Sequence, residues 1–108
     1  MSSQIPEPVT RLLDAANKHD TNAFLECFGD NGVVDDWGRE FVGTSAIRGW
    51  SDREFIGAAV TLKIVGSRVG PNGTIDVSAD VGGNGYNGPS QFIFTLQDGR
   101  VARMTIRG

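Results

Sequence analysis

The stretch that decides the fold is DDWGREFVGTSAIRGW, residues 35–50. It holds two adjacent carboxylates, both tryptophans of the chain and three glycines. A short strand over 32–35, a turn at 37–38 and a second strand over 39–42 are predicted to form a small hairpin. Thr44 is placed to cap a helix over 45–52, because a hydroxyl at this position can accept from the free N–H groups of the first turn. If the protein does chemistry, we expect it in this stretch.

Two further helices are predicted before this stretch. The apolar residues of the first recur at helical spacing: Ile5, Val9, Leu12, Leu13 and Ala16. This spacing predicts a helix over 6–18, with its prolines confined to the first turn. Asp20 is a suitable N-cap for a second helix that carries Phe24 and Phe28 and stops at Gly29.

After the stretch, the apolar period changes from 3.6 to 2, which indicates strands. The alternating runs are expected at 58–69, 75–81, 91–96 and 102–107. Turn signals separate them, namely Pro71-Asn72-Gly73, a glycine-rich loop over 82–89, and Asp98-Gly99. These runs predict an antiparallel meander of long strands.

Composition narrows the class of protein. The 108 residues fit one domain, 1–108, and the net charge is -3 with an isoelectric point near 4.9. Basic residues are scattered, which argues against nucleic-acid binding. One cysteine, Cys27, excludes an internal disulfide and a multi-cysteine metal site. No signal peptide or membrane-spanning run is recognisable, so we expect a cytoplasmic protein without metal or cofactor.

Helices first and strands afterwards predict an α+β fold. The expected architecture is a cone-like α+β barrel in which three N-terminal helices pack on a strongly curved antiparallel sheet. The open end of such a cone would form a pocket for a small apolar molecule. Ile93 is expected on the outer sheet face, with Val65 and Val69 beside it, which suggests a homodimer through the sheet.

The order of these elements resembles the nuclear transport factor 2-like superfamily, in particular its SnoaL-like branch. The resemblance rests on Val-Val-Asp-Asp at 33–36, Gly-Thr-Ser-Ala-Ile-Arg-Gly-Trp at 43–50 and Asp-Gly-Arg-Val at 98–101. The superfamily includes ketosteroid isomerases, SnoaL-type polyketide cyclases, limonene epoxide hydrolase and scytalone dehydratase. The resemblance covers nearly the whole chain. Its motifs are moderately specific for the fold and hardly specific for the function.

The resemblance implies a role for Asp36, which falls on the catalytic base position of ketosteroid isomerases through the match of Val-Asp-Asp-Trp at 34–37. The oxyanion donors of those isomerases do not carry over, because Leu12 and Phe92 stand near their positions. A partly desolvated carboxylate at the mouth of an apolar cone is a better base near neutral pH. The alternative is a turn aspartate that bonds its own backbone. Asp35 is expected on the opposite face, solvated or paired with Arg39 or Arg48.

Two further residues are candidates for catalysis. Tyr86, the single tyrosine, could serve as an acid or oxyanion donor, or it could be an exposed loop residue. Asp80 could pair with Asp36 across the pocket. With Arg68 it could also supply the Asp-Arg-Asp set implied by a limonene-type hydrolase. Alternatively, Asp80 is an outward strand residue.

Seven residues are candidates for substrate binding: Trp37, Arg39, Phe41, Trp50, Phe55, Phe92 and Met104. The aromatic members could select a flat ligand, and the alternative for each is core packing. Of the two tryptophans, Trp50 is expected in the core and Trp37 near the rim.

Two hypotheses therefore stand. The first is a cofactor-independent isomerase, cyclase or hydrolase that acts on an apolar cyclic substrate with Asp36 as general base. The second is a non-catalytic ligand-binding or dimerisation module of the same fold. Whether the protein is an enzyme stays open from the sequence.

Overall fold

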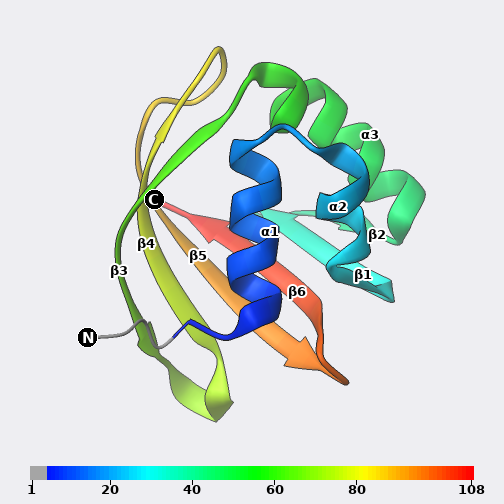
Figure 1. Ribbon diagram of the computed structural model, residues 1–108, viewed down its shortest axis with the longest axis vertical. Helices are drawn as coiled ribbons and strands as arrows, with labels where there is room; N and C mark the ends of the chain where they lie inside the picture. Colours follow the sequence, from blue (N-terminus) through cyan, green and yellow to red (C-terminus); the bar gives the residue numbers. More distant parts are fainter. Residues whose placement is uncertain (1–4) are drawn as a thin grey trace.

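The computed structural model describes residues 5–108, in which three helices lie on one face of a curved six-stranded sheet (Figure 1). The helices are α1 (Glu7–Asn17), α2 (Thr21–Glu26) and α3 (Thr44–Glu54), with short 3-10 turns η1 (Ile56–Ala58) and η2 (Pro71–Gly73). The strands are β1 (Phe28–Asp36), β2 (Arg39–Val42), β3 (Thr61–Val69), β4 (Ile75–Gly82), β5 (Gly88–Gln97) and β6 (Arg100–Arg107). The predicted α+β class and the three N-terminal helices are confirmed.

The sheet is mixed and open, which corrects the prediction of a wholly antiparallel sheet. Its strand order is β2-β1-β6-β5-β4-β3, and β1 runs parallel to β6 while every other neighbouring pair is antiparallel. A hairpin turn forces antiparallel pairing, but β1 and β6 lie far apart in sequence and no turn constrains their relative direction. The strands β2 and β3 are the two free edges, so the cone is not closed into a barrel.

Several predicted boundaries need correction. The strand expected over 58–69 begins at Thr61, because the 3-10 turn η1 occupies Ile56–Ala58. The second helix ends at Glu26, and Phe28 belongs to β1, because the Val101 N–H donates to the Cys27 carbonyl and recruits this backbone into the sheet (2.8 Å). The third helix begins at Thr44, with Gly43 at the N-cap position and no side-chain cap. The Asp20 cap is confirmed, since its carboxylate accepts from the Ala23 N–H at 3.1 Å.

The core lies between the helices and the sheet. Its largest fully buried side chains are Trp50, Phe24, Phe92, Phe94, Leu12, Ile47 and Met104. They come from all three helices and from β5 and β6, so the apolar stripe of each helix meets the inward face of the alternating strands.

Helix α1 is also tied to β3 by a side chain. The Asn17 amide accepts from the Leu62 N–H at 2.6 Å and donates to the Leu62 carbonyl at 3.0 Å. The two hydrogen bonds satisfy the backbone N–H and carbonyl of Leu62 as a residue of a neighbouring strand would. They fix the last turn of α1 against the edge strand β3.

The outer sheet face differs from the expectation at Val65 and Val69. Val65 lies at the register shift of β3 and is not part of its pairing with β4. Ile93 is half-buried on this face, opposite Asp76. A register shift between Ile64 and Gly66, however, places Val69 opposite the buried Ile75, on the helix-facing side. An extra residue in a strand reverses the facing of all that follow it, so Val69 does not join Ile93.

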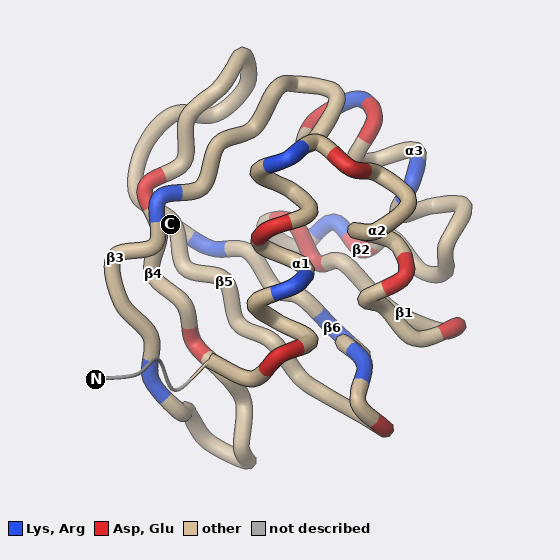
Figure 2. Tube along the Cα trace, viewed as in Figure 1, with Lys and Arg blue, Asp and Glu red and all other residues tan. Residues whose placement is uncertain are grey.

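Charged residues of both signs are interspersed along the helices and strands (Figure 2). None of the helices within residues 5–108 has the length and apolar character needed to cross a membrane.

Candidate functional site

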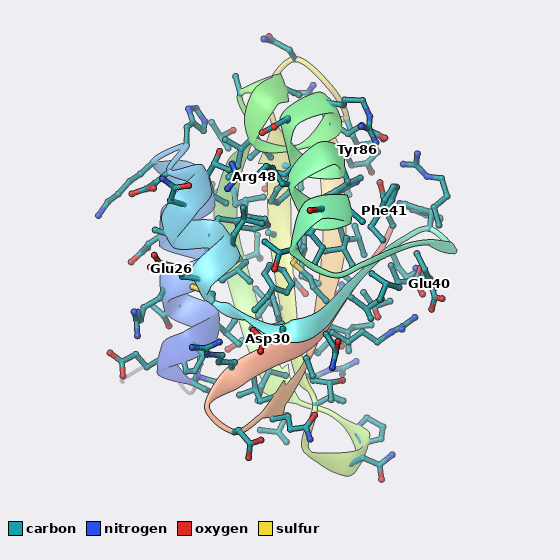
Figure 3. All side chains as sticks on the ribbon, turned by 90° about the vertical axis from the view of Figure 1, so that its right-hand side faces the viewer. Glu26, Asp30, Glu40, Phe41, Arg48 and Tyr86 are labelled. Carbon is teal, nitrogen blue, oxygen red and sulfur yellow. The ribbon has the colours of Figure 1, made fainter. Side chains whose placement is uncertain are left out.

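A cavity of about 250 Å³ opens beside the C-terminal half of α3, next to the end of β1 and the loop between β4 and β5. Its lining includes three charged residues, Asp36, Arg39 and Glu54, and five aromatic residues, Trp37, Trp50, Phe55, Tyr86 and Phe92. The remaining lining residues are Ala58, Val60, Val81, Gly82, Gly85, Ser90 and Ile106. Tyr86 lies on the side of α3 that borders this cavity, whereas Glu26 and Asp30 lie outside the cavity, nearer the N-terminal end of α3 (Figure 3).

The β1–β2 hairpin positions Asp36 at this cavity. Asp36 is the last residue of β1 and pairs with Arg39 across a two-residue turn. Both turn residues have positive φ, 54° at Trp37 and 91° at Gly38, as a type I′ turn requires. The turn holds Trp37 at the rim with 59% of its surface exposed.

The Asp36 carboxylate is held through one oxygen only. Its Oδ2 accepts from the Trp50 Nε1–H at 3.0 Å and from Arg39 at 2.6 Å. Its Oδ1 makes no hydrogen bond with any residue of 5–108, and 16% of the side chain is exposed. Two donors on one oxygen fix the orientation of the carboxylate. Oδ1 is therefore free to accept a proton from a bound molecule.

Glu54 joins this group, although the sequence reasoning missed it. Arg39 donates to both Glu54 oxygens, at 2.7 and 3.1 Å, and its guanidinium lies 5.6 Å from the Phe41 ring centre. The hydrogen bond from Arg39 lowers the pKa of Glu54, and the hydrogen bond to Glu54 raises the pKa of Arg39. The available signal was the i, i+4 spacing of Trp50 and Glu54, which puts both on one helix face.

Aromatic rings form the apolar walls. Trp50 stacks on Phe55 with ring centres 4.8 Å apart, and Phe55 lies 6.4 Å from Phe92. Tyr86 is 54% exposed, and its hydroxyl donates to the Pro89 carbonyl at 2.9 Å. The phenol proton of Tyr86 is thus already engaged, which weakens the assignment of this residue as an acid.

Asp80 does not reach the cavity. It is exposed on the outer sheet face, where it pairs in register with Lys63 of β3. Arg68, its predicted partner, instead makes a 3.5 Å contact with Asp76 on the same outer face. Because alternate strand residues face opposite sides, Asp80 forms no dyad with Asp36 inside the cavity. No Asp80–Arg68 set forms either, because Arg68 pairs with Asp76.

Two predicted substrate-binding residues also lie outside the lining. Met104 is completely buried in the core. Phe41 is half-buried and packs behind Trp50, with ring centres 6.1 Å apart. Both lie behind the walls of the cavity and are not part of its lining.

Asp35 faces the outer side, as its alternation with Asp36 predicts, but its partners are not Arg39 or Arg48. It is buried and accepts from Arg103 at 2.6 Å, from Arg107 at 3.1 and 3.2 Å, and from the Gly38 N–H at 2.7 Å. The Arg107 hydrogen bonds lead the causes that lower the pKa of Asp35 from 3.8 to about 2. Asp35 therefore anchors the hairpin and takes no part in the cavity.

We expect Asp35→Asn to lower the free energy of unfolding at pH 7 by roughly 1–2 kcal/mol, discounted because both arginines are partly solvated. The folded pKa of Asp35 lies below its unfolded value. Its contribution is therefore complete above about pH 4 and is lost as the pH falls through about 2. Urea unfolding of both proteins at pH 7 and pH 2 would show the gap closing. Exposed Asp30→Asn is the control, and a gap equal at both pH values would contradict the assignment.

Ser90 is a second lining residue that the sequence reasoning missed. It is buried on β5 and faces the same side as Phe92 and Phe94. A serine at an inward position of an alternating apolar strand was the available signal. Among residues 5–108, no group of three or more His, Cys, Asp or Glu side chains is arranged to hold a metal ion.

Comparison with known proteins places this geometry in context. The model of the SnoaL-like domain family matches residues 9–104. No curated protein matches the chain significantly. Among solved structures, a candidate polyketide cyclase from Sinorhizobium meliloti is 30% identical, with a TM-score of 0.82 and 95% of each chain covered.

Two more distant structures share the fold. A protein of ketosteroid isomerase-like fold from Catenulispora acidiphila, crystallised with trimethylamine, is 19% identical with a TM-score of 0.80, covering 99% of this chain and 87% of its own. The epoxide hydrolase/cyclase-like enzyme SalBIII, which takes part in pyran ring formation in salinomycin, is 21% identical with a TM-score of 0.77, covering 93% and 86%. At these identities the likeness concerns the fold alone.

Proposed function

The chain belongs to the SnoaL-like domain family, and we propose that it is a cofactor-independent isomerase, cyclase or hydrolase acting on an apolar cyclic substrate. Asp36 is its general base. The observation that carries this proposal is the Asp36 carboxylate in an aromatic-lined cavity, with Oδ2 held by Trp50 and Arg39 and Oδ1 free. The candidate polyketide cyclase at 30% identity supports the same class of chemistry.

The surroundings of Asp36 determine what kind of proton it can take. Arg39 and Trp50 both donate to Oδ2, so Oδ1 is the oxygen that can accept a proton from a bound molecule. Such a base suits a substrate proton acidified by a neighbouring carbonyl, or a water that attacks a strained ring.

Asp36, Arg39 and Glu54 also provide a carboxylate–arginine–carboxylate set inside the cavity. These are the residue types of the Asp-Arg-Asp set that a limonene-type hydrolase implies, with glutamate in place of one aspartate. The set favours epoxide opening among the possible reactions.

Cavity size limits the substrate. Ligand cavities commonly have roughly 300–1,000 Å³, and this cavity of about 250 Å³ lies just below that range. Molecules of one or two rings fit this volume better than a steroid.

Non-catalytic ligand binding is the second candidate function. The Tyr86 hydroxyl already donates to the Pro89 carbonyl. The resemblance to ketosteroid isomerases also places Leu12 and Phe92 near the positions of their oxyanion donors. The trimethylamine complex of the ketosteroid isomerase-like relative also favours small-molecule binding as such. Dimerisation through the outer sheet face, around Ile93, is compatible with either function.

A ligand screen tests the proposal. Monocyclic and bicyclic ketones and epoxides are tested for a rise in melting temperature, since a ligand that binds only the native state stabilises it, and then for turnover. Val81→Phe should abolish the shift because the larger ring fills the cavity, while Ile93→Phe on the outer face should not. Hits that are turned over support the enzyme, and hits that only bind support the binding module. A panel without hits, or hits that Val81→Phe leaves unchanged, would refute the cavity as the site.

A further inference from the structure

Ser90 is a polar side chain placed inside the apolar part of the cavity. Only 4% of its surface is exposed, and it pairs in register with the buried Ala79 on β4. Its side chain lies on the same strand face as Phe92, which lines the cavity with it. A hydroxyl at this depth requires a hydrogen-bond partner to offset its desolvation.

The protein does not supply that partner. Within residues 5–108 the Ser90 hydroxyl makes no hydrogen bond, although the other buried serine, Ser51, accepts from the Ile56 N–H at 3.4 Å. The Ser90 oxygen is not fully enclosed by protein atoms. Among residues 5–108, the one side-chain oxygen that is both fully enclosed and without a hydrogen bond is Asp76 Oδ1. Since Ser90 lines the cavity, the cavity is where its hydroxyl can find a partner.

The sheet register sets the separation of Ser90 from Asp36. Asp36 pairs with Ile106 on β6, and Ile106 pairs with Phe92 on β5. Ser90 precedes Phe92 by two residues on the same face. With strands roughly 4.8 Å apart and residues roughly 3.3 Å apart, the two backbones lie roughly 12 Å apart along the sheet. Side chains from both positions enter the cavity, so a ligand of one or two rings can touch both.

The geometry points to Ser90 as the residue that orients the ligand. Its hydroxyl donates to an acceptor oxygen at one end of the molecule, while the apolar body lies against Phe55 and Phe92 and the other end faces Asp36. This inference rests on the proposed function and specifies the ligand class. The ligand is a small one- or two-ring molecule with a single carbonyl or ether oxygen, rather than a hydrocarbon of the same shape.

The test uses a matched pair of probes, 1-tetralone and tetralin, which share a bicyclic body and differ in one carbonyl oxygen. Affinities are measured by titration with NMR detection for the wild type and Ser90→Ala. We expect the wild type to prefer the ketone by about 3- to 10-fold, the usual contribution of one hydrogen bond. Ser90→Ala should lose this preference and keep its affinity for tetralin. Ser78→Ala, a serine on the outer face, is the control and should keep the preference.

Two further measurements separate the possible outcomes. The melting temperature of Ser90→Ala should not fall, because no bond within the protein is lost, and a clear fall would indicate a structural hydroxyl instead. Asp36→Asn should keep the preference for the ketone. A preference that survives Ser90→Ala but disappears in Asp36→Asn would overturn the role of Ser90 and leave the proposed function standing. Equal affinity of the wild type for both probes, or binding of neither, would also overturn it.

Discussion

Asp36→Asn is expected to lower turnover by about 100-fold on a substrate identified by the ligand screen, the scale at which a general base contributes. Asparagine keeps the shape of the side chain. Its amide oxygen can still accept from the Trp50 Nε1–H, which lies 3.0 Å from Asp36 Oδ2 in the wild type. Arg39 retains both of its bonds to Glu54. The variant should therefore fold and bind, and lose only the group that accepts the proton.

The matched control for this variant is Asp80→Asn, which removes the same charge from the exposed outer face of the sheet. Steady-state kinetics of both variants, with binding measured separately, give kcat and affinity independently. Asp80→Asn should retain the kinetics of the wild type. If Asp36→Asn turned the substrate over within twofold of the wild type, Asp36 would not be the base.

Trp50→Ala should have the largest effect on stability, a loss of about 3–5 kcal/mol in the free energy of unfolding. Trp50 is 1% exposed, stacks on Phe55 and has Phe41 behind it. Truncation removes these contacts, opens a cavity in the core and deprives Asp36 of a donor. Urea unfolding at pH 7 measures the change.

The chain supplies a control for this prediction in its other tryptophan. Trp37→Ala at the exposed rim should change the free energy of unfolding by no more than about 0.5 kcal/mol. Trp50→Phe should fall between them, because it keeps the ring packing and loses the hydrogen bond to Asp36, at a cost of about 1 kcal/mol. Equal losses for Trp37→Ala and Trp50→Ala would show that burial does not distinguish the two positions.

Features that depend on neighbours in sequence could be predicted. The helical spacing of the first helix, the Asp20 cap, the turn at Trp37-Gly38 and the hairpin at Asp98-Gly99 all lie within a few residues of the groups that determine them. The alternation along the strands also indicated that Phe92 faces inward. For Asp80 it offered an outward position as one of two alternatives, the other being a pair with Asp36.

Features that depend on contacts between residues far apart in sequence could not be predicted. Arg103 and Arg107 contact Asp35 from 68 and 72 positions away, and no local pattern distinguishes them from other exposed arginines. No local pattern predicts the parallel pairing of β1 with β6 either. This pairing makes Phe28 part of β1 and not of the predicted second helix. Glu54 and Ser90 are ordinary residues in sequence and become notable only once the fold brings them to one cavity.

The place of β6 in the sheet bears on how the protein folds. Among the six strands of residues 5–108, β6 comes last in sequence, yet it lies between β1 and β5 and joins the β1–β2 hairpin to the β3–β5 meander. Until β6 has formed, β1 and β5 each have an unpaired edge, and the two halves of the sheet cannot join. Exposed edges of this kind invite association with other chains. Pairing of β6 with both neighbours is therefore the step that removes these two inner edges and leaves only β2 and β3 at the borders of the sheet.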